Sequence, residues 1–200
     1  MDKVLVTGAS GYIALHCISE LLQNGYSVRG SLRSPNRESQ VRNAIANNVD
    51  TKNNLEFCTL DLTNDDGWED AMNGCTYVLH VASPFPFKEP KNEDDLITPA
   101  REGTLRALKA AKKTGIKKVI LTSSCAAIQY GHNNPNKRFN HDDWTIINGP
   151  GITPYVKSKT IAEKAAWDFI NCQDEKNLEL TVINPSFVLG PSLSDDIGGT

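Results

Sequence analysis

Two side chains four residues apart, Tyr155 and Lys159 in the segment PYVKSKTIAEKAAW, have the types and spacing that proton transfer requires. On a helix this spacing places both on one face, one turn apart, so the phenol and the ammonium group can meet. An ammonium favours the phenolate, and the pair therefore predicts a tyrosine with a lowered pKa that gives a proton to a carbonyl oxygen. A bare pair of this kind is also common on surface helices.

A serine hydroxyl is the second candidate for chemistry. In the segment VILTSSCAA, Thr122, Ser123 and Ser124 follow an apolar run and finish a predicted buried strand in hydroxyl groups. Ligands of open α/β sheets bind beyond the carboxyl ends of the strands, so a serine there can orient a substrate carbonyl and stabilise charge on its oxygen. Strand-end serines can also simply bond backbone groups, an alternative that is stronger for Ser123 than for Ser124.

The N-terminal segment KVLVTGASGYIALH predicts a strand, a glycine turn and a helix. Gly8 and Gly11 allow the backbone to turn tightly and to approach a pyrophosphate, and Ser10 adds a hydroxyl donor. The small Ala14 suits close packing of the helix on the strand. An ordinary tight turn is the alternative for such a pattern on its own, but its place after the first strand favours a dinucleotide phosphate site.

The end of the second predicted strand, YSVRGSLRSP, indicates which dinucleotide binds. It offers Ser31 and Arg33 and no carboxylate before Glu38. A carboxylate would accept hydrogen bonds from a free ribose 2′-hydroxyl, whereas an arginine accommodates a 2′-phosphate, so the segment favours NADPH over NADH. A solvated surface arginine is the alternative for Arg33.

Further positions predicted to meet the cofactor follow the third and fourth strands. Asp61 and Leu62 are expected near adenine, and the small residues Val81, Ala82 and Ser83 leave room for a dinucleotide across the strand ends. His80, within an apolar strand, is interpreted as a core residue rather than as a catalytic group.

These residues are positioned by alternating strands and helices, the pattern of an α/β fold with a doubly wound parallel sheet. The predicted strands are Lys3–Thr7, Tyr26–Ser31, Leu55–Leu60, Thr76–Ala82, Lys117–Ser123 and Leu178–Asn184. The predicted helices are Tyr12–Asn24, Asn36–Asn47, Asp65–Asn73, Asp94–Thr114 and Pro154–Asn171. Gly25, Gly74 and Gly115 are expected to cap helix ends. Tyr130–Thr153 predicts a long loop, either a surface excursion or a wall of a substrate pocket.

Composition narrows the classes of partner. The formal net charge of the 200 residues is −3, without a long run of one sign, which argues against nucleic acid. The five cysteines are dispersed without a CxxC pair, as in a reduced, cytosolic protein, and no metal site is legible. No apolar run approaches the roughly 18 residues of a membrane span.

Together, VTGASGYIA, YSVRGSLRSP, HVASPF, LTSS, YVKSKTIAEKAAW and NPSFVLGP resemble the extended short-chain dehydrogenase/reductase superfamily, in its dihydroflavonol-reductase and cinnamoyl-CoA-reductase group, which includes fungal methylglyoxal and ketone reductases. The resemblance covers the whole chain and implies a Rossmann fold and the catalytic triad Ser124, Tyr155 and Lys159. It implies NADPH contacts from Gly8, Ser10, Gly11, Tyr12, Ile13, Arg33, Asp61, Leu62, Val81, Ala82, Ser83, Thr122, Tyr155, Lys159, Pro185 and Ser186.

The resemblance also implies a division of the chain and a reaction. Residues 1–190 are expected to form the dinucleotide-binding domain, and residues 191–200 to begin a C-terminal substrate lobe that is largely absent from this chain. The implied activity is that of an NADPH-dependent oxidoreductase that transfers hydride to a ketone or aldehyde. An NAD-dependent nucleotide-sugar epimerase or dehydratase and a non-catalytic dinucleotide sensor are the alternatives. Many members of the family form dimers, so a homodimer is one expectation from the resemblance. The sequence does not identify the carbonyl substrate.

Overall fold

The computed structural model describes residues 1–51, 53–85, 88, 90–173 and 177–194. Within them a six-stranded sheet has the order β3-β2-β1-β4-β5-β6, and every pairing is parallel. This order, which reverses between β1 and β4, is that of a Rossmann fold, as predicted. The strands are β1 (Lys3–Val6), β2 (Ser27–Leu32), β3 (Leu55–Thr59), β4 (Tyr77–His80), β5 (Lys118–Thr122) and β6 (Glu179–Ile183).

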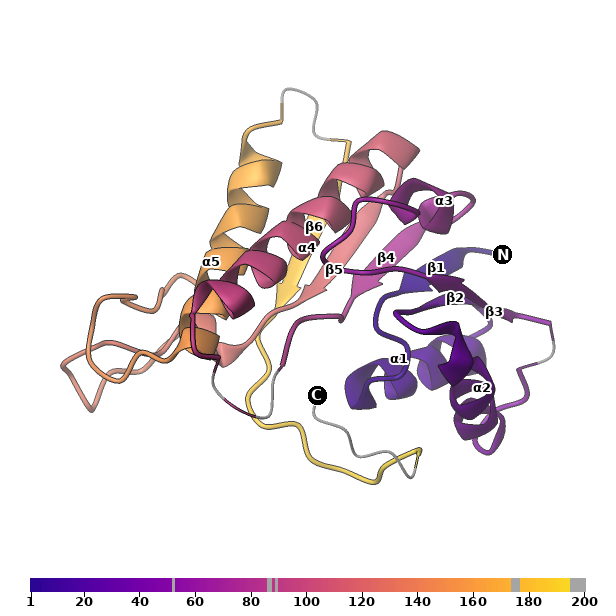
Figure 1. The fold of residues 1–200 in the computed structure, drawn as a ribbon, viewed down its shortest axis with the longest axis horizontal. Coiled ribbons are helices and arrows are strands. Elements are labelled where there is room, and N and C mark those ends of the chain that lie inside the picture. The colour runs from indigo at the N-terminus through magenta and orange to yellow at the C-terminus, as the bar shows by residue number, and fades with distance from the viewer. Residues whose placement is uncertain (52, 86–87, 89, 174–176, 195–200) are drawn as a thin grey trace.

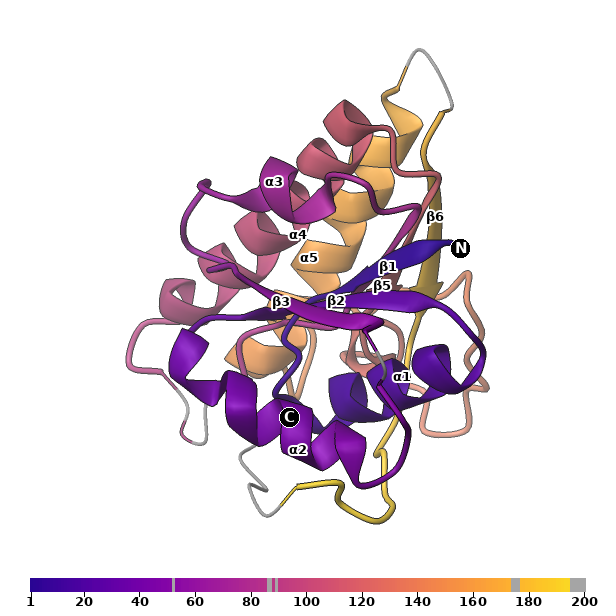
Figure 2. The same ribbon diagram turned by 90° about the vertical axis from the view of Figure 1, so that its right-hand side faces the viewer.

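Helices cover both faces of the sheet (Figure 1 and Figure 2). The helices of one face are α1 (Tyr12–Gln23) and α2 (Glu38–Ala46), and those of the other are α3 (Trp68–Met72), α4 (Asp94–Thr114) and α5 (Pro154–Asn171). Two short 3₁₀ turns are η1 (Pro35–Arg37) and η2 (Cys125–Ala127). An apolar cluster fills each interface, one that contains Val4, Ile18 and Val28 and one that contains Leu5, Leu108 and Val119. Alternate residues of β1 therefore serve opposite cores.

The predicted elements are all present, with shifts at their ends. Helix α3 begins at Trp68 instead of Asp65 because Asn64 Oδ1 accepts a hydrogen bond from the Asp66 N–H and closes a turn, and because Gly67 has a left-handed φ of 80°. The segment predicted as one helix from Asn36 divides into η1 and α2. Gly25, Gly74 and Gly115 have the positive φ expected of helix-ending residues.

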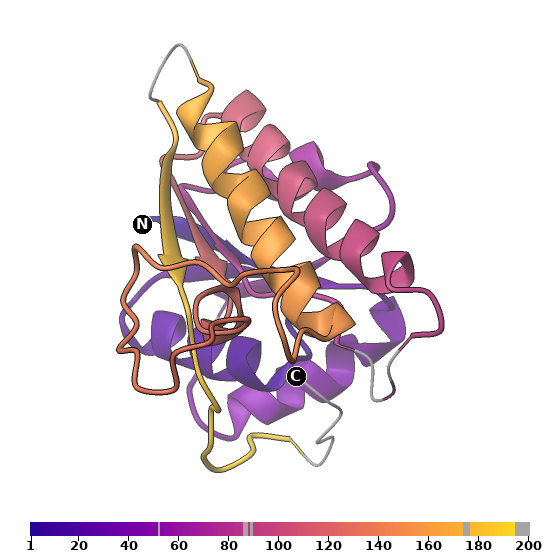
Figure 3. The ribbon, with the colours of Figure 1, turned by 90° about the vertical axis from the view of Figure 1, so that its left-hand side faces the viewer.

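The segment Tyr130–Thr153 contains no helix or strand, as predicted, and its residues are all described. Figure 3 shows it beside the N-terminal end of α5 and the carboxyl end of β6. The Thr145 hydroxyl anchors it: Oγ1 donates to the Ala126 carbonyl at 2.7 Å and accepts from the Tyr130 N–H at 3.0 Å. The loop is thus held against the end of β5, near the predicted catalytic residues.

Two further observations bear on function. None of the described helices combines the length and apolar character of a membrane span. The described residues likewise contain no group of three or more His, Cys, Asp or Glu side chains arranged to hold a metal ion. Residues 195–200, part of the segment expected to begin a substrate lobe, lie outside the described residues.

Candidate functional site

The glycine turn lies at the carboxyl end of β1, between that strand and the N-terminus of α1. Gly8 has φ 70°, and a Cβ placed on it would lie 3.1 Å from Cβ of Ala82, so this position needs a residue without a side chain. The Gly11 N–H donates to the Gly8 carbonyl at 2.8 Å and closes the turn. Helix α1 has no side-chain cap and no acidic residue in its first turn, so its first N–H groups can meet an anion.

Thr7, which the sequence reasoning did not assign, ties this turn to the end of β4. The Thr7 Oγ1 accepts from the N–H groups of Val81 and Ala82, both at 3.0 Å, and lies 3.0 Å from Nδ1 of His80. A hydroxyl has one proton, so with both acceptor positions used it donates to His80 Nδ1. The signal in the sequence was the threonine directly before the first glycine.

Ser31 and Arg33, the residues from which NADPH was predicted, lie at the end of β2 and have different roles. Ser31 is buried, and its Oγ accepts from the Gly8 N–H at 3.2 Å while its carbonyl accepts from the Ala9 N–H at 2.8 Å. Ser31 therefore shapes the glycine turn. Arg33 is exposed at the same edge and lies close enough to Asp61 to contribute to its lowered pKa.

Asp61 and Leu62 follow β3 at this edge. The Asp61 carboxylate accepts from the N–H and the hydroxyl of Thr63, both at 2.7 Å, and these bonds hold its pKa below the usual range. Leu62 is half-buried and packs on α4 at Gly103, where an added Cβ would lie 2.7 Å from Leu62 Cδ2. Part of the Leu62 side chain therefore packs in the apolar core.

The structure brings Ser124 and Tyr155 together. Ser124 caps η2, and its Oγ accepts from the Ala126 N–H at 3.1 Å. Tyr155, in the first turn of α5, is half-buried with its ring edge-on to Phe85 at 5.3 Å between centroids. Burial raises the pKa of Tyr155, and a hydrogen bond with Ser124 opposes that rise.

Lys159 does not act on Tyr155 as the sequence predicted. Its Nζ lies 5.9 Å from the centroid of the Tyr155 ring, and it is not among the groups that shift the Tyr155 pKa, which is raised rather than lowered. The prediction was wrong because it neglected burial, which disfavours both the phenolate form of Tyr155 and the ammonium form of Lys159. The same effect lowers the pKa of Lys159 to about 8 from its usual 10.5, against the opposing influence of Glu163.

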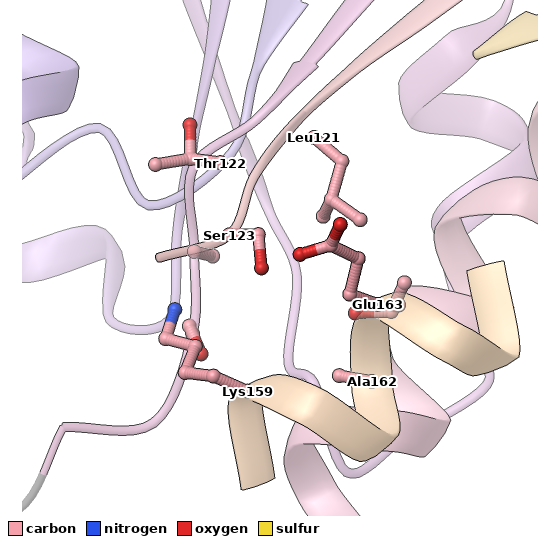
Figure 4. Close-up of a pocket in the computed structure, with 9 residues that line it drawn as sticks. Leu121, Thr122, Ser123, Lys159, Ala162 and Glu163 are labelled. Carbon is pink, nitrogen blue, oxygen red and sulfur yellow. The ribbon is translucent and has the colours of Figure 1, made fainter. Parts of the chain in front are cut away.

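Behind Lys159 is a small polar cavity of about 10 Å³. Figure 4 shows Ser123, Lys159 and Glu163 directed toward it, with Thr122 and Leu121 from β5 alongside. Glu163 is a buried carboxylate that the sequence reasoning missed, although its position four residues after Lys159 was the available signal. Ser123 lines the cavity, whereas Ser124 faces Tyr155.

The remaining predicted contact residues lie along the same strand ends. Ser10, Tyr12 and Ile13 are half-buried in the glycine turn and the start of α1, and Val81, Ala82 and Ser83 follow β4. Pro185 and Ser186 follow β6, where the Pro185 carbonyl accepts from the Cys125 N–H at 2.9 Å. The structure thus gathers the predicted residues at the carboxyl edge of the sheet. Beyond Pro185, Phe187 and Leu189 are exposed.

Comparison with known proteins agrees with this arrangement. The model of the NAD dependent epimerase/dehydratase family matches residues 4–198. Cinnamoyl-CoA reductase CAD2 of Medicago truncatula is 36% identical over 96% of this chain and 59% of its own. The crystal structure of Gre2 from Candida albicans in complex with NADPH is 34% identical with a TM-score of 0.83, over 96% of this chain and 60% of that one.

A second fungal structure, yeast methylglyoxal/isovaleraldehyde reductase Gre2 complexed with NADPH, is 32% identical with a TM-score of 0.84, over 95% of this chain and 59% of that one. The resemblance to the reductase group of the extended short-chain superfamily is therefore confirmed. The chain spans about 60% of the length of the curated relatives it matches.

Proposed function

The chain belongs to the NAD dependent epimerase/dehydratase family, and we propose that within it the protein is an NADPH-dependent oxidoreductase that reduces the carbonyl group of a ketone or aldehyde. The observation that carries the proposal is one shared edge of the sheet. The glycine turn lies there beside β4, and the pair Ser124 and Tyr155 lies there at the end of β5. A dinucleotide seated on the turn would extend toward these two hydroxyls.

The residues present fit a phosphorylated dinucleotide. Gly8 leaves a cradle that a Cβ would fill, α1 offers uncapped N–H groups, and Arg33 is an exposed cation at the end of β2. The proposed binding set is Gly8, Ser10, Gly11, Tyr12, Ile13, Arg33, Asp61, Leu62, Val81, Ala82, Ser83, Thr122, Tyr155, Lys159, Pro185 and Ser186. When bound, NADPH supplies the hydride for the reduction.

In the proposed mechanism the protein's own residues orient the carbonyl and supply the proton. The Ser124 hydroxyl donates a hydrogen bond to the substrate oxygen and positions it, and the Tyr155 hydroxyl transfers its proton to that oxygen as negative charge develops. The raised pKa of Tyr155 keeps its proton in place before reaction. The hydrogen bond with Ser124 opposes that rise in the chain without substrate, and it holds the two hydroxyls side by side where the substrate oxygen would bind. Buried surroundings strengthen both contacts because water competes less.

Lys159 is proposed to act beside this pair through its charge and its N–H groups. It is almost wholly buried and lies one turn beyond Tyr155, with its Nζ 5.9 Å from the centroid of that ring, so it is placed to donate to a ribose hydroxyl of the cofactor. With a pKa of about 8, it is mostly protonated at pH 7 and loses its charge in mildly alkaline solution. The rate of carbonyl reduction is therefore expected to fall as the pH rises through about 8.

The reductase hypothesis is favoured over an NAD-dependent epimerase or dehydratase because the relatives compared above are reductases, two of them solved with NADPH. A dinucleotide sensor would not need the contact between Ser124 and Tyr155. The dispersed cysteines support a cytosolic location, and a homodimer remains an expectation from the resemblance. We place the boundary of the dinucleotide-binding domain near residue 190.

The test is the loss of NADPH absorbance with a panel of aldehydes, ketones and diketones, with NADH as the matched cofactor control. We expect turnover of at least one carbonyl class with NADPH and much weaker turnover with NADH. Tight binding of NADPH without reduction of any carbonyl, or conversion of a nucleotide sugar without net oxidation of the cofactor, would overturn the proposal.

A further inference from the structure

Glu163 is a buried carboxylate that the proposed reduction does not use. It lies on α5 one turn after Lys159, with about 6% of the residue exposed. Carboxylates are rarely buried without partners, because removal of their charge from water is costly. Its partners therefore indicate what holds it there.

One partner is Asn184, directly after β6. The Asn184 Nδ2 donates to Glu163 Oε2 at 2.7 Å and to the Ser124 carbonyl at 3.1 Å. Both amide protons are thus used, one toward α5 and one toward the end of β5. This bridge joins the helix that carries Tyr155 to the strand end that carries Ser124.

Glu163 also lines the cavity beside Lys159. This cavity has room for about one water molecule, and the Ser123 Oγ, buried beside it, has no hydrogen-bond partner among the described residues. Lys159 and Glu163 border the same space, four residues apart on one helix face (Figure 4). The ammonium and the carboxylate therefore face each other across a small polar space, without a direct ion pair between them in the described residues.

The titratable groups near Lys159 are Tyr155 and Glu163 from α5 and His80 from β4. The polar side chains that line the cavity with it are Ser83 after β4, Thr104 from α4, and Thr122 and Ser123 at the end of β5. Burial and the charge of Lys159 lower the pKa of His80 to about 4, so His80 is neutral near pH 7. Glu163 is then the group among them that opposes the loss of the Lys159 charge.

We propose that Glu163 is a positioning residue of this site, a buried carboxylate that supplies the negative charge facing Lys159 and, through Asn184, holds α5 against the strand end that carries Ser124. The inference rests on the proposed function for its catalytic consequence. The charge that faces Lys159 is a property of the folded chain and can be measured without turnover.

The first experiment measures the ionisation of Lys159 directly, by competitive acylation of the protein across pH 6–11 and mass spectrometry of the peptide that contains Lys159. In Glu163→Gln the side-chain oxygen can still accept from Asn184, but the charge is gone. We expect labelling of Lys159 to begin about one pH unit lower than in the parent protein. Glu163→Asp, which keeps the charge, should restore the titration toward the parent's, and Asp168→Asn, which removes another carboxylate from α5, should leave it unchanged.

A titration of Lys159 that is the same in Glu163→Gln as in the parent would overturn the charge assignment. The bridge is tested separately by Asn184→Ala, which leaves the charge in place. We expect it to lower kcat several-fold with little change in NADPH affinity and in the titration of Lys159, and a parental kcat would overturn the bridging role.

The two proposals can fail independently. If no carbonyl is reduced by the parent protein, the function is wrong, and the labelling experiment still decides whether Glu163 controls the charge of Lys159. If turnover is present, the alkaline limb of the kcat/KM profile should move to lower pH in Glu163→Gln together with the labelling curve. An unmoved limb would contradict the catalytic part of the inference.

Discussion

The glycine turn and the Tyr155 region lie along one edge of the same sheet, yet they are held by different interactions. At the turn, the Thr7 and Ser31 hydroxyls bond backbone N–H groups of Gly8, Val81 and Ala82. Around Tyr155, the buried groups include the ionisable side chains of Lys159 and Glu163. His80 lies between the two regions, since it is bonded to Thr7 and is influenced by the charge of Lys159. Neutral hydroxyl groups stabilise the glycine turn, whereas the Tyr155 region contains a buried ammonium group and a buried carboxylate.

The difference predicts different sensitivities. Hydroxyl-to-backbone bonds do not titrate between pH 4 and 9, so the turn should respond to steric changes rather than to pH. Buried ionisable groups pay for desolvation in their charged forms, so the Tyr155 region should respond to pH and to changes of charge. Substitutions in each region test this contrast.

The largest effect is expected in the Tyr155 region. Tyr155→Phe removes the transferable proton and little else, so kcat should fall by about 10²–10⁴-fold while NADPH affinity stays near that of the parent. Steady-state kinetics and calorimetric titration with NADPH measure the two quantities. Tyr26→Phe, a tyrosine between α1 and β2, is the matched control and should leave kcat unchanged. Near-parental turnover in Tyr155→Phe would show that another group is the acid.

At the glycine turn, Gly8→Ala combines a left-handed φ with a Cβ 3.1 Å from Cβ of Ala82. The free energy of unfolding should fall by about 1–3 kcal/mol, and NADPH affinity should weaken because the phosphate cradle must shift. Denaturant unfolding and calorimetry measure these effects. Gly25→Ala is the control, because Gly25 has a similar φ of 81° but nothing lies within 4 Å of the new Cβ. It should lower the free energy of unfolding through backbone strain alone and leave NADPH affinity unchanged. Equal NADPH affinities in the two variants would contradict the role of the cradle.

The pH response of stability should come in part from His80. Its pKa of about 4 in the folded chain is below the unfolded value near 6.5, so between these values the unfolded chain binds more protons and stability falls as pH falls. Between pH 7 and 5 this amounts to about 2 kcal/mol. His80→Asn keeps an acceptor for Thr7 but does not titrate, so its stability should decline less over this interval. An unchanged slope of unfolding free energy against pH would count against the assignment.

The smallest effect is expected at Arg33, which is exposed. Arg33→Ala should reduce the preference for NADPH over NADH by about tenfold, or about 1.4 kcal/mol, through loss of a contact to the 2′-phosphate. The affinities of both dinucleotides, measured by calorimetry at one salt concentration, give the ratio. Arg138→Ala, an exposed arginine in the loop beside α5, is the control and should leave the ratio as it was. Equal affinities of the parent protein for the two cofactors would refute the role of Arg33.

Local patterns predicted most of the fold because they act over a few residues. The alternation of apolar runs and helical segments indicated the parallel sheet, and Gly25, Gly74 and Gly115 marked helix ends through their backbone conformation. The start of α3 was misplaced because Gly67 and the Asn64 turn interrupt a pattern that otherwise reads as helical. The spacing of Tyr155 and Lys159 likewise placed them on one helix face, since helical periodicity depends only on the chain itself.

Sequence patterns alone thus identify the sheet, the glycine turn and the pair on α5, while burial and contacts between distant segments follow from the fold. The pKa of Tyr155 is raised although a lysine lies one turn away, because desolvation depends on everything packed around the ring. Asn184 meets Glu163 and Ser124 only because β6 lies beside β5, and Thr7 reaches His80 only because β1 pairs with β4. Such contacts join residues 21 to 73 positions apart, a separation at which no local periodicity carries information.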